Sequence, residues 1–122
     1  MKIYTSYFAK ADRLPSNIIR VAICRFQPKW FTSHCEKMIE LAPSQTLLFN
    51  YKQNHDETAY TAQYNAYLQT LNAADVVNKL AALSNGKDVA LLCYERPSDF
   101  CHRHLVAHWL SNNGIDCSEY AF

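Results

Sequence analysis

Glycine is scarce in this 122-residue chain, in which only Gly86 and Gly114 occur. Two glycines are too few for the Walker and Rossmann phosphate loops, which need several of them close together. Long hydrophobic runs are also lacking, since the longest falls well short of the roughly 18 residues that span a bilayer. The chain starts on a strand-like segment, without the hydrophobic region and cleavage site of a signal peptide. We therefore expect a soluble, cytoplasmic protein with no membrane partner.

An excess of either charge is lacking as well. Twelve Lys+Arg stand against eleven Asp+Glu, which gives a net charge of +1, and neither sign forms a run. This balance argues against a strongly basic nucleic-acid surface, although it allows a small local patch. The five cysteines are an odd number, which is untypical of a secreted disulfide framework. We expect free thiols, several of them buried, in a reducing compartment.

The residues that are present are typical of a packed globular protein, with 49% hydrophobic and 13% aromatic residues. The length fits a single domain over residues 1–122. An uninterrupted apolar run over Asp88–Cys93 indicates a central strand that is covered on both faces. Alternating or β-branched apolar residues predict further strands at Lys2–Tyr7, Ile18–Cys24, Thr46–Asn50 and Ile115–Tyr120.

Three segments have apolar side chains at the three- and four-residue spacing of amphipathic helices. The first two run from Glu57 to Leu71 and from Ala74 to Leu83, and we expect the tyrosine stripe of the first to be a packing face. The third follows Pro97, with Ser98 or Asp99 as its N-cap. Strands that alternate with helices predict a three-layer α/β domain with a mostly parallel sheet.

The segment between the central strand and the last helix carries the residues best suited to chemistry. Ligands of α/β proteins bind beyond the carboxyl ends of strands, and Glu95 follows directly after such an end. Cys101, His102 and Arg103 come in the first turn of the predicted helix, whose N-terminus attracts phosphate or carboxylate. The same field, together with Arg103, would favour the thiolate of Cys101. Glu95 would be a general base, an acceptor for a ribose hydroxyl, or the ion-pair partner of Arg103.

Two other interpretations of this segment stay open. Glu95 and Arg103 can form a purely structural ion pair that ties a loop to a helix. Alternatively, Cys93 and Cys101 can stabilise the domain by binding zinc with nearby histidines, such as His104, which shares a helix face with the histidine four positions later. Neither Cys-x-x-Cys nor His-Glu-x-x-His occurs, so we predict no metal site and no cofactor.

Several motifs resemble those of a known family. Cys93-Tyr94-Glu95 followed by Cys101-His102-Arg103 resembles the strand-end and helix-start motifs of the domain-of-unknown-function 488 (DUF488) family, also called the YeaO-like family. Ile3–Tyr7, Arg25-x-x-Pro28-x-Trp30 and Tyr51-Lys52 are similar to further motifs of that family, so the resemblance covers nearly the whole chain. It implies a compact α/β domain with a Rossmann-like core and a function directed at nucleotides or nucleic acids.

These observations predict a polar pocket at the carboxyl edge of the sheet. Its ligand would carry a phosphate, as a nucleotide or a nucleic-acid end does, and would be held by Arg25, Arg103 and the helix N-terminus. Glu95 would be the acid/base group, and Cys101 a thiolate or polar anchor, in an N-glycosidic or group-transfer reaction. The other ligand-binding residues would be Thr5, Ser6, Tyr7, Cys93 and His102.

The competing hypothesis is a non-catalytic binding or interaction module. In that case Trp30, Trp109 or Tyr94 would fill the pocket and leave no room for a substrate. Replacing Arg103 by alanine separates the two hypotheses, because the first expects lost ligand binding with an intact fold and the second expects unfolding. The sequence leaves open whether the chain is catalytic and whether it forms a homo-oligomer.

Overall fold

The computed structural model describes all of residues 1–122. Two short 3-10 helices, labelled η, occur beside the α-helices and strands. The elements follow one another in the order β1 (Ile3–Tyr7), η1 (Phe8–Arg13), β2 (Ile19–Ala22), β3 (Glu36–Lys37), η2 (Ile39–Leu41), α1 (Gln45–Asn54), α2 (Glu57–Leu68), α3 (Ala73–Ser84), β4 (Val89–Cys93), α4 (His102–Asn112) and β5 (Cys117–Glu119).

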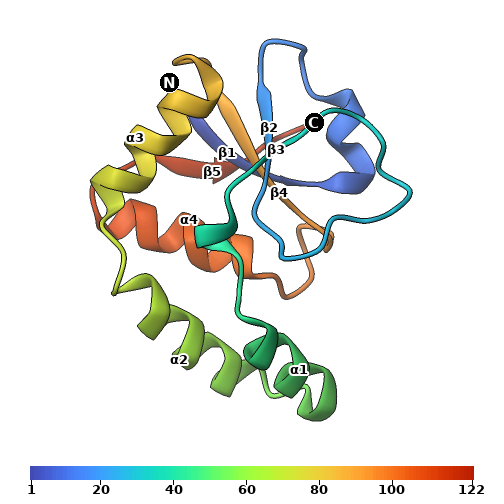
Figure 1. The fold of residues 1–122 in the computed structure, drawn as a ribbon, viewed down its shortest axis with the longest axis vertical. Helices are drawn as coiled ribbons and strands as arrows, with labels where there is room; N and C mark the ends of the chain where they lie inside the picture. Colours follow the sequence, from blue (N-terminus) through green and yellow to red (C-terminus); the bar gives the residue numbers. More distant parts are fainter.

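A five-stranded, all-parallel sheet forms the centre of the molecule, with strand order β3-β2-β4-β1-β5 (Figure 1). β4 lies between β2 and β1, and every one of its residues is buried. Because Tyr7 pairs with Cys93 and Ala22 pairs with Leu92, the carboxyl ends of these three strands meet at one edge. The predicted α/β class, parallel sheet and central position of the Asp88–Cys93 segment are confirmed.

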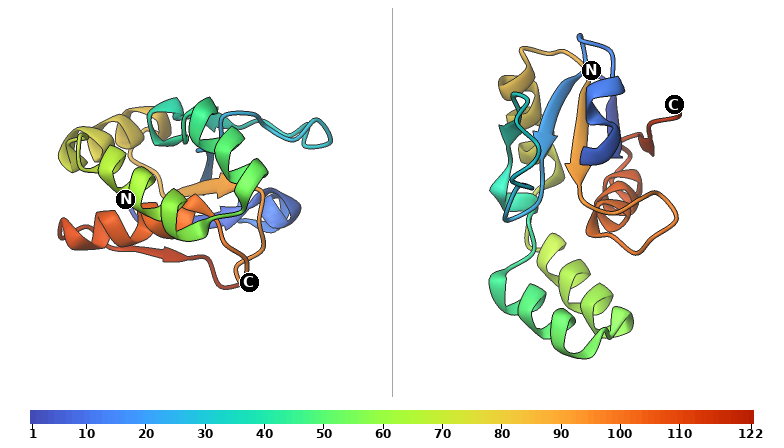
Figure 2. Two further views of the ribbon diagram at one scale, coloured as in Figure 1. Left: turned by 90° about the horizontal axis from the view of Figure 1, so that it is seen from below. Right: turned by 90° about the vertical axis from the view of Figure 1, so that its right-hand side faces the viewer.

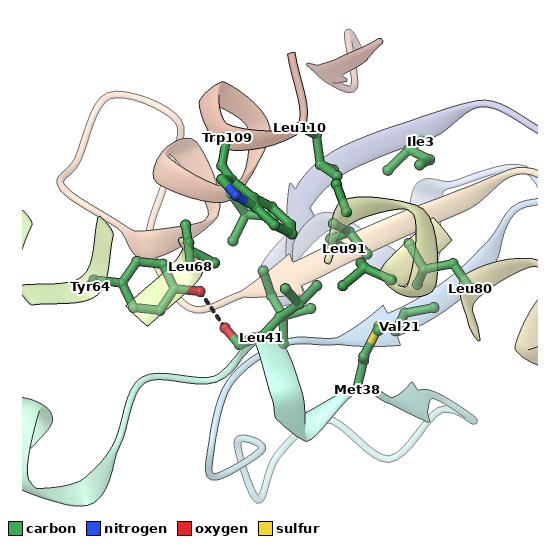
Figure 3. Packing of buried hydrophobic residues seen from close by; sticks show 14 of the residues in the cluster. Ile3, Val21, Met38, Leu41, Tyr64, Leu68, Leu80, Leu91, Trp109 and Leu110 are labelled. Atoms are coloured by element: carbon green, nitrogen blue, oxygen red, sulfur yellow. Dashed lines mark hydrogen bonds between the residues drawn. The ribbon is translucent and has the colours of Figure 1, made fainter. Parts of the chain in front are cut away.

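The two faces of the sheet are covered by different parts of the chain. Val89 and Leu91 of β4 belong to the larger core cluster, which includes side chains of α2, α3 and α4 (Figure 3). Ala90 and Leu92 belong to a second cluster, formed with η1 and the loop that follows β2. Successive side chains of β4 therefore pack on opposite faces of the sheet. One face is covered by helices, and the other is covered by a 3-10 helix and loops.

Helices α1 and α2 form a hairpin that extends beyond the carboxyl edge of the sheet (Figures 1 and 2). α2 is anchored by its tyrosine stripe, as expected, because Tyr60 and Tyr64 are buried. The Tyr64 hydroxyl donates a hydrogen bond to the carbonyl of Leu41 in η2 (Figure 3). No helix in the structure combines the length and hydrophobicity needed to cross a membrane.

The predicted strand Thr46–Asn50 is wrong, because these residues belong to α1. Ser44 is in an extended conformation and caps this helix by accepting a hydrogen bond from the Leu47 N–H at 3.1 Å. Such a cap satisfies one of the free N–H groups at the helix start. It outweighs the weak strand preference of the threonine and phenylalanine that follow.

The predicted N-cap of the last helix is also wrong. Cys101, rather than Ser98 or Asp99, occupies that position in α4. The residues after β4 instead form a turn, in which Asp99 N–H donates to the carbonyl of Arg96 at 3.0 Å. The two-residue strand β3 and both 3-10 helices were not predicted, since elements so short leave no periodic pattern in a sequence.

Candidate functional site

A pocket of about 470 Å³ opens at the carboxyl edge of the sheet, between the ends of β2 and β4. Helix α1 and the first turns of α2 and α4 also contribute residues to its lining. Its volume is within the range of small-molecule binding sites. The lining residues come from segments far apart in the chain: Cys24, Arg25, Phe26, Pro43, Leu48, Tyr51, Lys52, Tyr60, Cys93, Tyr94, Glu95, Phe100, Cys101 and His102.

Aromatic side chains form much of the pocket wall. Tyr51, Tyr60 and Phe100 contact one another, with ring centroids 5.2–5.4 Å apart. Elsewhere in the lining, the Tyr94 hydroxyl donates a hydrogen bond to the carbonyl of Phe26, and both side chains are exposed. Flat aromatic surfaces of this kind favour planar, π-rich ligands such as nucleobases.

Two cationic side chains reach the pocket without an acidic partner. Arg25 donates from Nε to the carbonyl of Pro43 at 2.9 Å, which fixes its guanidinium and leaves the two terminal nitrogens free. Lys52 lies on α1 and is exposed, with no ion pair. The only acidic residue in the lining is Glu95, which is also exposed. The pocket therefore has an excess of positive charge, which suits an anionic group such as phosphate.

Cys93, Cys101 and His102 form a buried cluster in the pocket lining. The two sulfur atoms are joined in a disulfide, which links the end of β4 to the N-cap of α4. The expectation that all five cysteines are free thiols is therefore wrong for this pair, because the strand end and the helix start bring their sulfurs together. Cys24, Cys35 and Cys117 remain free.

The same three residues are the group best placed to hold a metal ion, since their ligand atoms lie within 4.8 Å of one another. Zinc would require both sulfurs as thiolates, so metal binding and the disulfide exclude each other. His104 is only half-buried and His108 is exposed, and neither belongs to this group.

His102 is oriented by a hydrogen bond to the backbone. Its Nε2 atom lies 2.6 Å from the carbonyl oxygen of Ile23, and because a carbonyl only accepts, Nε2 must carry the proton. The unprotonated Nδ1 atom then faces Cys93, 3.9 Å from its sulfur. Burial is the main cause that lowers the pKa of His102 to about 4, and the positive charge of Arg103 acts in the same direction. His102 is therefore neutral near pH 7.

The protein is expected to lose stability as the pH falls from 6.5 to 4, because His102 is folded in its neutral form. Its pKa is about 4 in the folded protein and 6.5 in the unfolded chain, so the unfolded state takes up the proton first. The difference corresponds to about 3 kcal/mol of unfolding free energy, which is fully present above pH 6.5 and is lost as the pH approaches 4. Urea unfolding at a series of pH values measures this change.

The control for this prediction is the His102→Gln variant. The quantity compared is the slope of the unfolding free energy against pH, rather than the absolute stability. The variant should show a shallower decrease over the same pH range. A smaller dependence remains in it, because burial also lowers the pKa of His104. An equally steep decrease in the variant would mean that other groups cause the pH dependence.

Arg103 is fully buried, and all of its donors face the protein interior. Nε and Nη2 donate to the two carboxylate oxygens of Glu119 at 3.0 and 3.1 Å, and Nη1 donates to the backbone carbonyl of Glu95 at 2.6 Å. The alternative in which the side chains of Glu95 and Arg103 form an ion pair is therefore wrong, since the carboxylate comes from Glu119 of β5. Arg103 does not line the pocket and is not available to bind a phosphate there.

The β1 residues that were predicted to bind a ligand do not line the pocket either. β1 lies on the side of β4 away from β2, whereas the pocket opens between β2 and β4. Thr5 donates its hydroxyl to Glu119 at 2.7 Å, and the Tyr7 ring centroid lies 5.6 Å from the Arg103 guanidinium. Both residues support the buried ion pair. Ser6 is fully buried, and its hydroxyl has no partner.

The structure thus brings five of the predicted site residues into one pocket: Arg25, Cys93, Glu95, Cys101 and His102. The sequence predicted no ligand-binding role for the other lining residues or for Glu119. Tyr51 and Lys52 carried a signal only through the family resemblance. No local pattern points to Glu119, because its contact with Arg103 depends on β5 pairing with β1.

Comparison with known proteins agrees with the motifs described above. A family model described as "Active DUF488-N3 subclade" matches residues 3–114, a range that contains every element from β1 to α4. No curated protein and no solved structure matches the chain. The match covers most of the sequence and confirms the resemblance, so the chain belongs to the DUF488 family.

Proposed function

We propose that the pocket binds a ligand with a phosphate and a planar ring, either a free nucleotide or the end of a nucleic acid. One observation carries this proposal: two cations without acidic partners and an aromatic wall line the same 470 Å³ pocket. Arg25 and Lys52 would hold the phosphate through charge-assisted hydrogen bonds. The base would stack on the exposed faces of the wall, for which Tyr51 and Phe100 are the candidates.

The open space of the pocket favours this proposal over a module that binds no small ligand. That alternative expects Trp30, Trp109 or Tyr94 to fill the pocket. Trp30 and Tyr94 are exposed instead, and Trp109 packs in the main core. The burial of Arg103 gives it a structural role under either hypothesis, so Arg103→Ala no longer distinguishes them.

Glu95 is the acid/base group of the proposed reaction, an N-glycosidic cleavage or group transfer. Its side chain lines the pocket, is exposed and has no protein partner, so a bound ligand can exchange a proton with it. Glu95→Gln should still bind the ligand, because the amide keeps the size of the side chain and removes a negative charge near the phosphate. Chromatography of nucleotides incubated with each protein should detect a released base or transferred group only with the unmodified protein.

Isothermal titration calorimetry with nucleoside monophosphates, matched nucleosides and 5′-phosphorylated single-stranded oligonucleotides tests the binding proposal. Monophosphates should bind and nucleosides should bind much more weakly. Tighter binding of the oligonucleotide would identify the nucleic-acid end as the source of the phosphate, and equal binding would identify the free nucleotide. Equal, weak heats for all ligands would overturn the proposal.

Variants of the two cationic residues test which side chains hold the phosphate. Lys52→Ala and Arg25→Ala should each weaken monophosphate binding by about 10- to 100-fold, the usual effect of losing a hydrogen bond to a charged group. Lys52 is the more informative of the two, because it has no structural contact that its loss would break. Lys87→Ala is the matched control, since Lys87 is exposed in the turn before β4, at the opposite edge of the sheet. An equal loss in the Lys87 variant would indicate only a general charge effect.

A further inference from the structure

The disulfide in the pocket lining has no part in the proposed binding of phosphate. Its two cysteines differ in surroundings and in access. Cys101 is the N-cap of α4 and is 6% exposed, whereas Cys93 is the last residue of the central strand and is only 1% exposed. A molecule in the pocket therefore meets the sulfur of Cys101 more readily than that of Cys93.

We propose that Cys93 and Cys101 form a reversible redox pair that undergoes thiol–disulfide exchange with small thiols entering the pocket. Cys101 is the sulfur that is attacked, and Cys93 is the sulfur that leaves. The proposal is independent of the phosphate ligand, because it requires only access to the pocket and the groups that surround the two sulfurs.

The groups around Cys93 suit a departing thiolate. Arg103 Nη1 lies 3.8 Å from the Cys93 sulfur and presents a full positive charge, and its ion pair with Glu119 holds it there. A positive group at this distance stabilises a thiolate. Exchange becomes faster when the leaving thiolate is stabilised.

The Nδ1 atom of His102 favours the reduced pair for a separate reason. It is a buried hydrogen-bond acceptor that faces the Cys93 sulfur at 3.9 Å. A disulfide offers it no proton, so in the oxidised pair this acceptor is unsatisfied. After reduction the Cys93 S–H group supplies the missing donor, which makes reduction more favourable.

The reaction balances with two molecules of a small thiol, RSH. The thiolate of the first attacks the Cys101 sulfur, so that a new S–S bond forms to R, the Cys93–Cys101 bond breaks, and its electron pair goes to Cys93. Cys93 takes up the proton that the first thiol released. The thiolate of the second thiol attacks the R sulfur of the mixed disulfide, so that the bond from this sulfur to Cys101 breaks and its electron pair goes to Cys101. The disulfide RSSR leaves, and Cys101 takes up the proton that the second thiol released. The reverse reaction oxidises the pair with a small disulfide.

The other cysteines serve as internal controls. Burial raises the pKa of Cys24 to about 11, that of Cys35 to about 11 and that of Cys117 to about 12. These three thiols remain protonated near pH 8 and are poor nucleophiles. Reaction with a small disulfide should therefore concentrate on the redox pair.

Intact-protein mass spectrometry of reduced variants with oxidised glutathione tests the order of attack. Cys93→Ser should retain one glutathionyl group on Cys101, because no second sulfur is present to displace it. Cys101→Ser should form about tenfold less adduct, because Cys93 is shielded from the pocket. Cys24→Ser, a cysteine of the same pocket outside the pair, should behave as the unmodified protein. Equal adduct in the two pair variants would overturn the proposed order.

A second measurement needs no variant and is therefore unaffected by misfolding. The protein is equilibrated with mixtures of reduced and oxidised glutathione, denatured in acid and alkylated, and the alkyl groups are counted. The count should pass from five, the total number of cysteines, to three, the number of free ones, in a single transition. Five groups at every ratio would overturn the proposal. Binding of one zinc ion per protein that prevents oxidation of the reduced pair would also overturn the proposal, because the cluster would then be a metal site.

Discussion

Replacing Glu119 by alanine is expected to lower the free energy of unfolding by about 3 kcal/mol, because the substitution leaves a buried guanidinium without its carboxylate. Arg103 is completely buried, whereas the Glu119 side chain is 26% exposed. The variant therefore loses the two hydrogen bonds from Nε and Nη2, and water cannot replace them at the buried end. Urea denaturation followed by circular dichroism gives the free energy directly.

Two companion variants show whether the charge is the cause. Glu119→Gln keeps one oxygen that accepts from Arg103, so its loss should be smaller than that of the alanine variant. Glu36→Ala removes an acidic residue of the other edge strand, whose partner His34 is largely exposed, and should change stability by no more than about 0.5 kcal/mol. A Glu119→Ala protein as stable as the Glu36→Ala protein would mean that the guanidinium is neutralised in another way.

The second large effect is expected for Tyr64→Ala, which should lower the free energy of unfolding by about 3–5 kcal/mol, as truncation of a buried aromatic residue commonly does. Tyr64 is fully buried in the main core and joins α2 to η2 through its hydrogen bond to Leu41 (Figure 3). Its ring also contacts the ring of His102 at 5.5 Å and that of Tyr60 at 6.1 Å. The substitution should therefore disturb the pocket wall as well as the core.

Tyr64→Phe separates the hydrogen bond from the packing. It keeps the ring but leaves the carbonyl of Leu41 without its donor, at a cost of about 1–3 kcal/mol. Tyr67→Ala is the matched control, because Tyr67 lies on the same helix and is 38% exposed, with its hydroxyl bound to the carbonyl of Glu40. If Tyr67→Ala and Tyr64→Ala destabilised the protein equally, burial of the tyrosine stripe would not explain the effect.

Long, strongly patterned elements could be predicted from the sequence, because burial on one or both faces requires apolar side chains at regular positions along the element. The β4 segment is the clearest case, since its unbroken apolar run follows directly from its central position in the sheet. Helix α1 shows the opposite situation. Thr46 and Phe49 indicated a strand. The Ser44 side chain, however, accepts a hydrogen bond from the Leu47 N–H and caps a helix, so a single residue decides which element forms.

The candidate site could be predicted only where its residues are close in the chain. Glu95, Cys101 and His102 follow one strand end and were found together, and Arg25 follows the neighbouring strand end. The Cys93–Cys101 disulfide depends on how the loop between them returns the chain to the sheet, which spacing alone does not specify. The ion pair with Glu95, one of the alternatives for Arg103, is wrong for the same reason, because this nearer glutamate offers only its backbone carbonyl.

The place of β1 in the sheet constrains the order in which the molecule can assemble. β1 precedes every other strand of the sheet in the sequence, yet both of its neighbours, β4 and β5, come from the last third of residues 1–122. Lys2 and Asp88, which are hydrogen-bonded, are 86 positions apart. β1 therefore stays unpaired until β4 and β5 have been synthesised, and strand pairings this distant in sequence form slowly. Because Glu119 lies on β5, the last of the five strands in the sequence, the charge of the buried Arg103 is balanced only once β5 has taken its place beside β1.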